Sequence, residues 1–169
     1  MRHIRPLVAE DRAAVDRITR TCGAFTADEE TICLELIDAA LHGSKEYEVV
    51  VACEGDNVLG FLTYGTDPIG RGVWEVYWIV TDPNLQNRGV GSALLSWLHD
   101  HVDGRMILIE TGGRPAYEAQ RRFYLKNGYR EVSRIKDFYT PGDDLVVFRR
   151  DLVPVLESQS RGRVAEAAR

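Results

Sequence analysis

The sequence predicts an α/β protein with a central mixed β-sheet of about six to seven strands and helices on both faces. Runs rich in β-branched and aromatic residues alternate with segments whose apolar residues recur at helical spacing, in the order β-α-α-β-β-β-α-β-α-β-β. Strand–helix–strand crossovers around Gly89 and Met106 imply parallel pairing, whereas the hairpins imply antiparallel pairing elsewhere. The sheet is therefore expected to contain both kinds of pairing.

The first quarter of the chain predicts one short strand, at residues 3–5, and two helices. Apolar residues at helical spacing predict the first helix over residues 7–22. Thr26 and Glu29 fit a capping box at the start of the second helix, where hydroxyl and carboxylate each bond an exposed backbone N–H. We expect Gly43 to end this helix. Its buried side is expected to comprise Ile32, Leu36, Ile37 and Leu41.

The pattern then changes to that of strands. Residues 47–53 and 58–66 flank a turn at residues 55–57, which predicts an antiparallel hairpin. Residues 74–81 are large and mostly apolar on both faces, so we expect a central strand there. A helix is expected from about Gly89. Its inner side is expected to carry Val90, Ala93, Leu94, Trp97, Leu98 and His101.

The last third predicts three strands and one helix. Residues 106–110 form a near-continuous apolar run, typical of a strand buried on both faces. A proline before residues 116–127 and a glycine after them suit the two ends of a helix. Residues 129–139 and 145–152 are the last two strands. Proline followed by glycine within residues 140–143 fits the centre of a type II turn between them.

The 169 residues are enough for one domain with a sizeable core. We expect this domain at residues 1–153 and a flexible tail at residues 154–169. The formal net charge of −5 argues against a nucleic-acid partner. No stretch is apolar and long enough to cross a membrane, and the start lacks a secretory signal, so a cytoplasmic protein is expected. The cysteines and histidines show no metal-ligand spacing, so no metal is expected.

The segment from Trp78 to Ser92, WIVTDPNLQNRGVGS, predicts an anion site at the start of a helix. The first amides of a helix have no internal partners, and the helix dipole adds positive potential there. Gly89 and Gly91 remove side chains, so that an anion can touch the backbone. Arg88 adds a positive charge at the rim. Such a site suits a phosphate or a diphosphate.

Three families use such a site. A P-loop would need Gly-Lys-Ser/Thr, which is missing, and a dinucleotide site would need a glycine where Leu94 stands. The segment from Gln86 to Gly91 instead resembles the coenzyme A-binding turn of the GNAT superfamily, Gln/Arg-x-x-Gly-x-Gly/Ala. Residues 121–129, RRFYLKNGY, resemble its second motif, and residues 137–144 resemble an ending of many bacterial members. The resemblance covers residues 4–152.

The resemblance implies the GNAT fold and an acetyl-CoA-dependent N-acetyltransferase. The acetyl group passes directly from acetyl-CoA to a primary amine, with no acyl-enzyme. Main-chain groups of the middle strand would hold the pantetheine arm by strand addition, and the glycine turn would hold the diphosphate. Many members have an asparagine at the position of Tyr117, so contacts on that side are left open. The residues assigned to the cofactor are Ile79, Val80, Thr81, Gln86, Asn87, Arg88, Gly89, Val90, Gly91, Ser92 and Tyr117.

Two residues are candidates for catalysis. Tyr124 lies where the family has its general acid, and a preset phenol can give a proton to the leaving thiolate. The alternative interpretation is that Tyr124 is an ordinary aromatic residue of the core. Glu75 is the candidate base, because it lies four positions before Ile79 and so would share its face, and because partial burial raises the pKa of a carboxyl group. Its alternatives are a structural glutamate paired with an arginine, or a water chain without a base. Weaker candidates are Glu110, Asp137 and Asp144.

The acceptor does not follow from the sequence. It is expected to be a small amine or a protein N-terminus or lysine, and the acidic balance favours a cation. Aromatic residues that can line its cleft, or fill core instead, are Tyr64, Tyr77, Trp78 and Tyr139. A homodimer is expected only by analogy with other GNAT proteins, among which dimers are frequent. Two other function classes stay open, a non-catalytic acyl-CoA-binding sensor or regulator and a nucleotide-dependent enzyme using the glycine turn for ATP.

Overall fold

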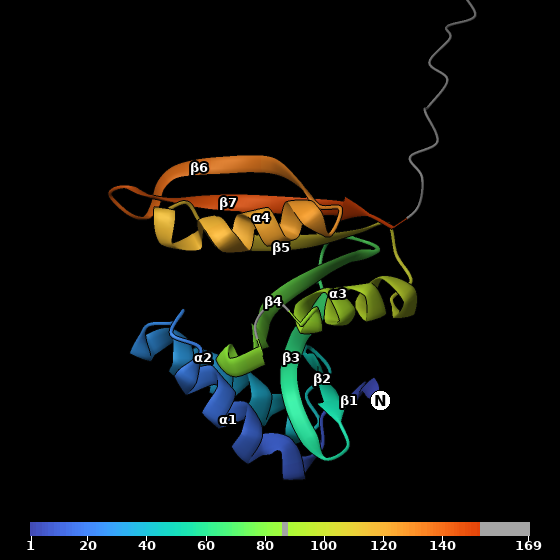
Figure 1. The fold of residues 1–169 in the computed structure, drawn as a ribbon. Coiled ribbons are helices and arrows are strands. Elements are labelled where there is room, and N and C mark those ends of the chain that lie inside the picture. The colour runs from blue at the N-terminus through green and yellow to red at the C-terminus, as the bar shows by residue number, and fades with distance from the viewer. Residues whose placement is uncertain (86–87, 153–169) are drawn as a thin grey trace, which may run out of the picture.

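The computed structural model describes residues 1–85 and 88–152, which form one seven-stranded mixed sheet with four α-helices (Figure 1). The strand order is β1-β2-β3-β4-β5-β7-β6. The strands are β1 (Arg2–Pro6), β2 (Glu48–Glu54), β3 (Asn57–Thr66), β4 (Val73–Thr81), β5 (Met106–Gly112), β6 (Arg130–Thr140) and β7 (Asp143–Asp151). The helices are α1 (Arg12–Thr21), α2 (Ala27–Leu41), α3 (Val90–His101) and α4 (Glu118–Lys126). The predicted fold class and element order are confirmed.

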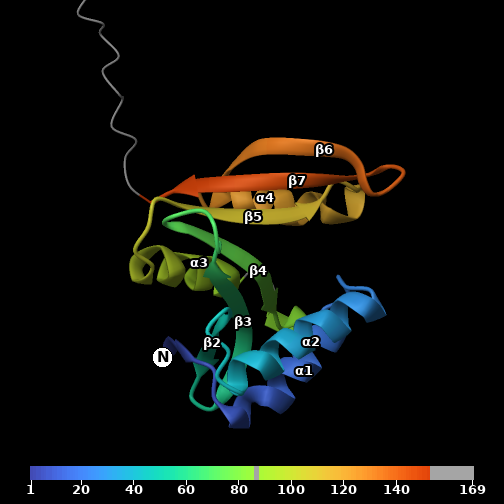
Figure 2. The same ribbon diagram turned by 180° about the vertical axis from the view of Figure 1, so that it is seen from behind.

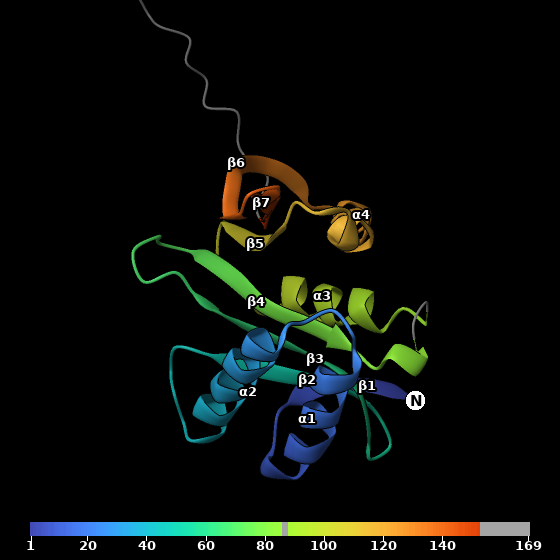
Figure 3. The same cartoon turned by 90° about the vertical axis from the view of Figure 1, so that its left-hand side faces the viewer.

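Helices cover both faces of the sheet and enclose two apolar cores. Figure 3 shows α1 and α2 on one side of β2, β3 and β4, and α3 on the other. The core under α1 and α2 includes Ile18, Ile37 and Phe61, and the core under α3 and α4 includes Leu94 and Phe148. All five side chains are at most 1% exposed. These two cores fix the sheet between the layers and thereby hold the β4–α3 turn in place.

The sheet opens in its middle, between β4 and β5. These strands are parallel, and their register has four residue pairs, from Val73–Met106 to Val76–Ile109. Beyond that point β4 continues along β3 as far as Thr81, while β5 continues along β7 as far as Gly112. The two parts of the sheet are seen one above the other in Figures 1 and 2. The end of β4 is therefore left with its β5-facing backbone edge open.

The crossover after β5 does not add a second parallel pair. Its chain passes through α4 to β6, and β6 pairs antiparallel with β7 at the edge of the sheet. The hairpin return then inserts β7 antiparallel beside β5. The turn between β6 and β7 has Gly142 at φ 84°, as the second central position of a type II turn requires.

The helix starts were predicted better than the helix faces. Thr26 and Glu29 form the expected capping box on α2, with the Thr26 N–H donating to Glu29 at 2.8 Å. The predicted buried side of α2 is wrong in part, because Ile32 is 56% exposed and the buried residues are Cys33, Leu34 and Ile37. Two apolar stripes run along α2; one packs on α1 and β2, and the stripe with Ile32 faces a cleft.

The inner face of α3 differs from the prediction in a similar way. Leu95 is fully buried, whereas His101 is exposed on the last turn and stacks on Trp97 with ring centroids 4.0 Å apart. Of the residues that the structure describes, none belongs to a helix with both the length and the hydropathy needed to span a membrane.

Candidate active site

A hollow of about 910 Å³ lies where β4 and β5 part. Its walls come from the first part of α2, the middle of β4, the end of β5, one face of α4 and the β6–β7 turn. Both candidate catalytic residues line this cleft, Glu75 from β4 and Tyr124 from α4. The sheet opening thus brings together residues 49 positions apart in the sequence.

A β-bulge in β4 changes which side chains face the cleft. Thr63 pairs with Trp78 but Tyr64 pairs with Val76, so Tyr77 is an extra residue on β4. The buried Thr63 hydroxyl accepts the Trp78 N–H at 2.9 Å, which satisfies the amide that the bulge displaces. Such a bulge shifts the alternation of side chains along the strand.

The prediction that Glu75 and Ile79 share a face of the strand is therefore wrong. Before the bulge, Trp74 and Val76 point to the core under α3, so Glu75 points to the opposite face. After the bulge, Ile79 points to the α3 side, while Trp78 and Val80 point to the core under α1 and α2. The prediction counted four positions along the sequence and assumed a regular strand without a bulge. Glu75 lines the cleft from the α2 side of the sheet.

The surroundings of Glu75 keep its pKa above the usual glutamate value. Burial is the largest cause, followed by the negative charges of Asp67 and Glu110, while the Tyr77 hydroxyl acts in the opposite direction. Within residues 1–85 and 88–152, no arginine or lysine is among the groups that shift its pKa. The structure therefore gives no support to the alternative of a structural glutamate paired with an arginine.

Tyr124 belongs to the core and to the cleft at the same time. It is 6% exposed, and its ring centroid lies 5.5 Å from that of Phe148 and 6.3 Å from that of Tyr129. Burial raises the pKa of Tyr124 to about 12, so the phenol is fully protonated at neutral pH. A protonated phenol on a fixed ring at the cleft wall has the form that a proton donor needs.

The start of α3 has the backbone geometry expected of an anion site. Gly89 caps the helix in the left-handed region at φ 74°, and the first helical hydrogen bond runs from the Ala93 N–H to the Gly89 carbonyl at 3.0 Å. The N–H groups of Val90, Gly91 and Ser92 precede that bond and point out of the helix end. Gln86 and Asn87, also assigned to the cofactor, lie outside the described residues.

Gly91 is glycine for a reason that the sequence did not reveal. A Cβ added there would lie 3.0 Å from Cζ of Phe123 and 3.3 Å from its Cε2, on α4. The absent side chain therefore admits the Phe123 ring between the two helices. A Cβ on Gly89 would meet no atom of the described residues within 4 Å, so among these residues only the backbone conformation requires glycine there. Val90 is 2% exposed and can offer a ligand only its main chain.

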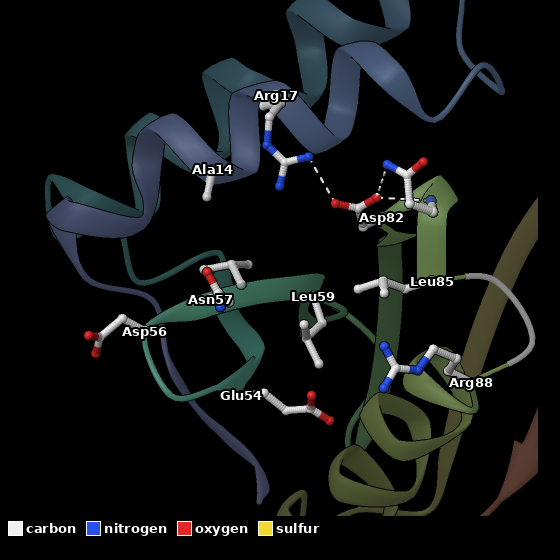
Figure 4. A pocket seen from close by; sticks show the side chains of 11 residues that line it. Ala14, Arg17, Glu54, Asp56, Asn57, Leu59, Asp82, Leu85 and Arg88 are labelled. Carbon is white, nitrogen blue, oxygen red and sulfur yellow. Dashed lines mark hydrogen bonds and ion pairs between the residues drawn. The ribbon is translucent and has the colours of Figure 1, made fainter.

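Arg88 is placed differently from the expectation of a charge at the rim. Its side chain lines a second hollow of about 520 Å³, between α1, the β2–β3 turn and the segment after β4 (Figure 4). In that hollow Arg17 binds Asp82 at 2.8 Å, and Asp82 caps the Asn84 N–H at 2.9 Å. The Arg17 hydrogen bond, above all, holds the pKa of Asp82 below its usual value.

The backbone of Ile79, Val80 and Thr81 lies on the open edge of β4, as strand addition requires. Ile79 also lines the cleft, and the Val80 side chain is buried in the other core. Tyr117 lines the cleft as well. A Cβ on Gly112 would lie 2.6 Å from its ring, so the Tyr117 ring packs against the end of β5.

Three of the four aromatic residues expected at the acceptor side line the cleft, namely Tyr77, Trp78 and Tyr139. Tyr64 does not: it is 4% exposed and donates its hydroxyl to Glu48 at 3.0 Å. The turn candidates also have other roles, since Asp137 accepts the Gly142 N–H at 2.6 Å and Asp144 binds Arg134 at 3.1 Å.

Asp143 is a cleft residue that the sequence did not single out. It is 3% exposed, binds Arg114 at 2.8 Å and accepts the Gly113 N–H at 3.1 Å. It thereby ties the start of β7 to the β5–α4 loop. Its place in a predicted turn concealed it, because aspartate is common in turns, where its side chain bonds nearby backbone groups. Within residues 1–85 and 88–152, no cluster of three or more His, Cys, Asp or Glu residues could hold a metal ion.

Comparison with known proteins gives a consistent result. Residues 45–131 match the sequence profile of the acetyltransferase (GNAT) domain. A GNAT-family protein from Desulfovibrio desulfuricans is 33% identical, with a TM-score of 0.86 over 90% of this chain and 100% of that chain. The N-alpha-acetyltransferase RimI of Mycobacterium tuberculosis is 28% identical over 149 residues, covering 78% of this chain and 92% of that protein. The ribosomal-protein-S18-alanine N-acetyltransferase of Escherichia coli shares the fold, with a TM-score of 0.73 at 20% identity over 94% and 98% of the two chains.

The chain belongs to the GNAT family of acetyltransferases. It is an acetyl-CoA-dependent N-acetyltransferase, and a non-catalytic role as an acyl-CoA sensor is not supported.

Proposed function

We propose that the chain moves the acetyl group of acetyl-CoA directly to a cationic primary amine held in the cleft between α2 and the β6–β7 turn. The observation that carries this proposal is the placing of Glu75 and Tyr124 on one cleft, at the point where β4 and β5 part. A donor threaded through the sheet opening brings its thioester between the two side chains.

The donor site in this proposal uses the open edge of β4 and the start of α3. Main-chain groups of residues 79–81 bind the pantetheine arm as an added strand. The N–H groups of residues 89–92 receive the diphosphate, where the helix dipole favours negative charge. Gln86, Asn87 and Tyr117 complete the set of proposed donor contacts, whereas the Arg88 side chain lines the second hollow. This placing is supported by Gly89, because a Cβ added there would meet no atom of the described residues within 4 Å.

Glu75 takes a proton from the incoming ammonium group, directly or through one water. Its raised pKa makes it a better proton acceptor than an ordinary glutamate. The amine lone pair then attacks the thioester carbonyl carbon, and the nitrogen gives its second surplus proton to solvent water. The C–S bond breaks, and the thiolate of coenzyme A leaves.

Tyr124 donates its hydroxyl proton toward the leaving sulfur. Transfer from a phenol with a pKa of about 12 is uphill to a thiolate whose conjugate acid has a pKa of about 8.5. We therefore infer that Tyr124 first stabilises the sulfur as a hydrogen-bond donor, and that the proton follows as the thiolate departs.

The acceptor side of the cleft is apolar and acidic. Phe25 packs edge-on against Trp78 with ring centroids 4.8 Å apart, and Ile32 and Tyr139 add exposed apolar surface. Carboxylates at the cleft attract a cation. The similarity to RimI, named for acetylation of α-amines, favours the amino group of a protein N-terminus; a lysine or a small amine is the alternative.

The test measures release of coenzyme A thiol from acetyl-CoA with a panel of peptides and small amines. Tyr124→Phe is expected to lower kcat by about 10²-fold or more with unchanged affinity for acetyl-CoA. Tyr129→Phe is the matched control, because this tyrosine is 3% exposed and binds His99 at 3.0 Å outside the cleft lining. Equal kcat for wild type and Tyr124→Phe would remove Tyr124 from the mechanism.

Three further parts of the proposal concern the whole chain. Residues 1–153 form the acetyltransferase domain and residues 154–169 a dispensable tail, so a chain ending at residue 153 is expected to keep its activity.

The protein acts in the cytoplasm, without nucleic acid or membrane, which cell fractionation tests. A homodimer is proposed through β6, whose eleven residues are all exposed; sedimentation measures it.

A further inference from the structure

Arg2 reaches from the first strand to the turn at the start of α3. Its Nη1 donates to the carbonyl oxygen of Arg88 at 3.0 Å, although the two residues are 86 positions apart. Its Nη2 lies 3.7 Å from Oε1 of Glu54, the residue opposite Arg2 in the β1–β2 register. The guanidinium group is thus held by the sheet on one side and holds the turn on the other.

The bond to Arg88 sets the direction of the next amide. The structure contains no cis peptide bonds among its described residues, so the Arg88 carbonyl and the Gly89 N–H point in opposite directions across one planar peptide. A carbonyl directed at Arg2 therefore directs the Gly89 N–H away from β1. Gly89 is in the left-handed region, and the N–H groups of Val90 and Gly91 follow it. Consecutive N–H groups in such a turn form a concave anion site.

The stability of the first strand alone does not explain Arg2. Its Nε is buried and has no hydrogen-bond partner within the described part of the chain. A buried donor without a partner destabilises a fold. An aliphatic residue at this position would cover the same surface without burying an unpaired donor. It would, however, leave the Arg88 carbonyl without its hydrogen bond and free to rotate.

We propose that Arg2 is a positioning residue for the co-substrate: by holding the Arg88 carbonyl, it presets the turn that receives the diphosphate of coenzyme A. Glu54 orients the guanidinium group for this task. The inference rests on the proposed location of the diphosphate at the start of α3. In this proposal Arg2 does not touch the diphosphate. Substitution of Arg2 is expected to weaken only the binding of the diphosphate, and not the binding of the rest of the donor.

The test compares two acetyl donors, acetyl-CoA and S-acetylpantetheine, which lacks the diphosphate. In the full chain, Arg2→Met is expected to raise the KM for acetyl-CoA about five- to tenfold. The kcat with either donor and the KM for acetylpantetheine are expected to stay unchanged. Arg2→Lys is expected to restore part of the loss, since an ammonium group can still donate to the carbonyl.

Arg130→Met is the matched control, because Arg130 pairs with Asp151 at 2.7 Å on β6 and β7, outside the donor site. It is expected to leave both donors unaffected. Equal losses with the two donors in Arg2→Met, or no loss with either, would overturn the proposal.

Gly89→Asp separates this inference from the proposed diphosphate site. If Gly89→Asp loses acetyl-CoA selectively and Arg2→Met does not, the diphosphate site stands and the role of Arg2 is wrong. If the wild type has the same KM for both donors, the diphosphate makes no contribution and both proposals are wrong.

Discussion

Asp67 and Glu75 are neighbouring carboxylates at the turn end of the β3–β4 hairpin. Asp67 follows β3, where it accepts the Ile69 N–H at 2.8 Å and also bonds the Gly70 N–H, so its position is fixed by the turn. Those two backbone bonds hold the pKa of Asp67 below its usual value and keep it charged. After burial, the charge of Asp67 is the next cause of the raised pKa of Glu75. A turn residue thus tunes the proposed base.

The activity is expected to fall at acid pH as Glu75 takes up a proton. Because its pKa is raised, this loss occurs at a higher pH than for an ordinary glutamate. Asp67→Asn removes a negative charge, lowers the pKa of Glu75, and should move the acid limb of kcat/KM to lower pH. Asp100→Asn, on the exposed face of α3, serves as control. An acid limb that stays in place in Asp67→Asn would contradict the coupling.

Gly89→Asp is expected to weaken coenzyme A binding by more than about tenfold, because the new carboxylate meets the diphosphate at the helix start. Titration calorimetry measures this change. Gly43→Asp is the matched control, since Gly43 also has a positive φ, at 85°, and open space around it, but it follows the far end of α2. Both variants have similar backbone strain, so only the first is expected to lose affinity.

Gly91→Ala is expected to destabilise the chain by about 1–3 kcal/mol, because its Cβ would press on the Phe123 ring. Urea denaturation measures the loss. Phe123→Leu makes room and should recover part of the cost when the two changes are combined, which a double-mutant cycle reports. Strictly additive effects would show that the two residues do not compete for one space.

Asp143→Asn is expected to cost about 1–2 kcal/mol, since the buried carboxylate loses its charge while Arg114, half exposed, is rehydrated by solvent. The β5–α4 loop carries Tyr117, so the KM for acetyl-CoA should rise as well. Thermal melting and donor kinetics measure the two effects. Asp137→Asn, at the exposed turn, is expected to leave the kinetics unchanged.

The sequence predicted the fold well because each element carries a local signal. The capping box of Thr26 and Glu29 and the glycine at position 89 act through backbone groups next to them, so spacing is enough to find them. The face of Glu75 could not be found this way, because it depends on a bulge fixed by Thr63 on another strand.

The prediction of the site from the sequence is limited in the same way, because it depends on contacts between distant residues. Ile32 and Ile37 belong to two apolar stripes of α2, and nothing within the helix tells which stripe meets the core and which meets the cleft. The bond between Arg2 and Arg88 spans the chain and leaves no pattern at either end. Contacts between distant residues are decided by packing, which a single sequence does not display.

Only four residue pairs join β4 to β5, and they are the seam between the two parts of the sheet. A ligand that adds its own amides beside the free end of β4 lengthens this seam, and a ligand bound to the native state alone raises the free energy of unfolding. Resistance to heat and to proteases should therefore rise with donor concentration, and β4 amides should exchange more slowly with deuterium. Without acetyl-CoA, the purified protein is expected to be least stable at the β4–β5 seam, beside the proposed site of the reaction.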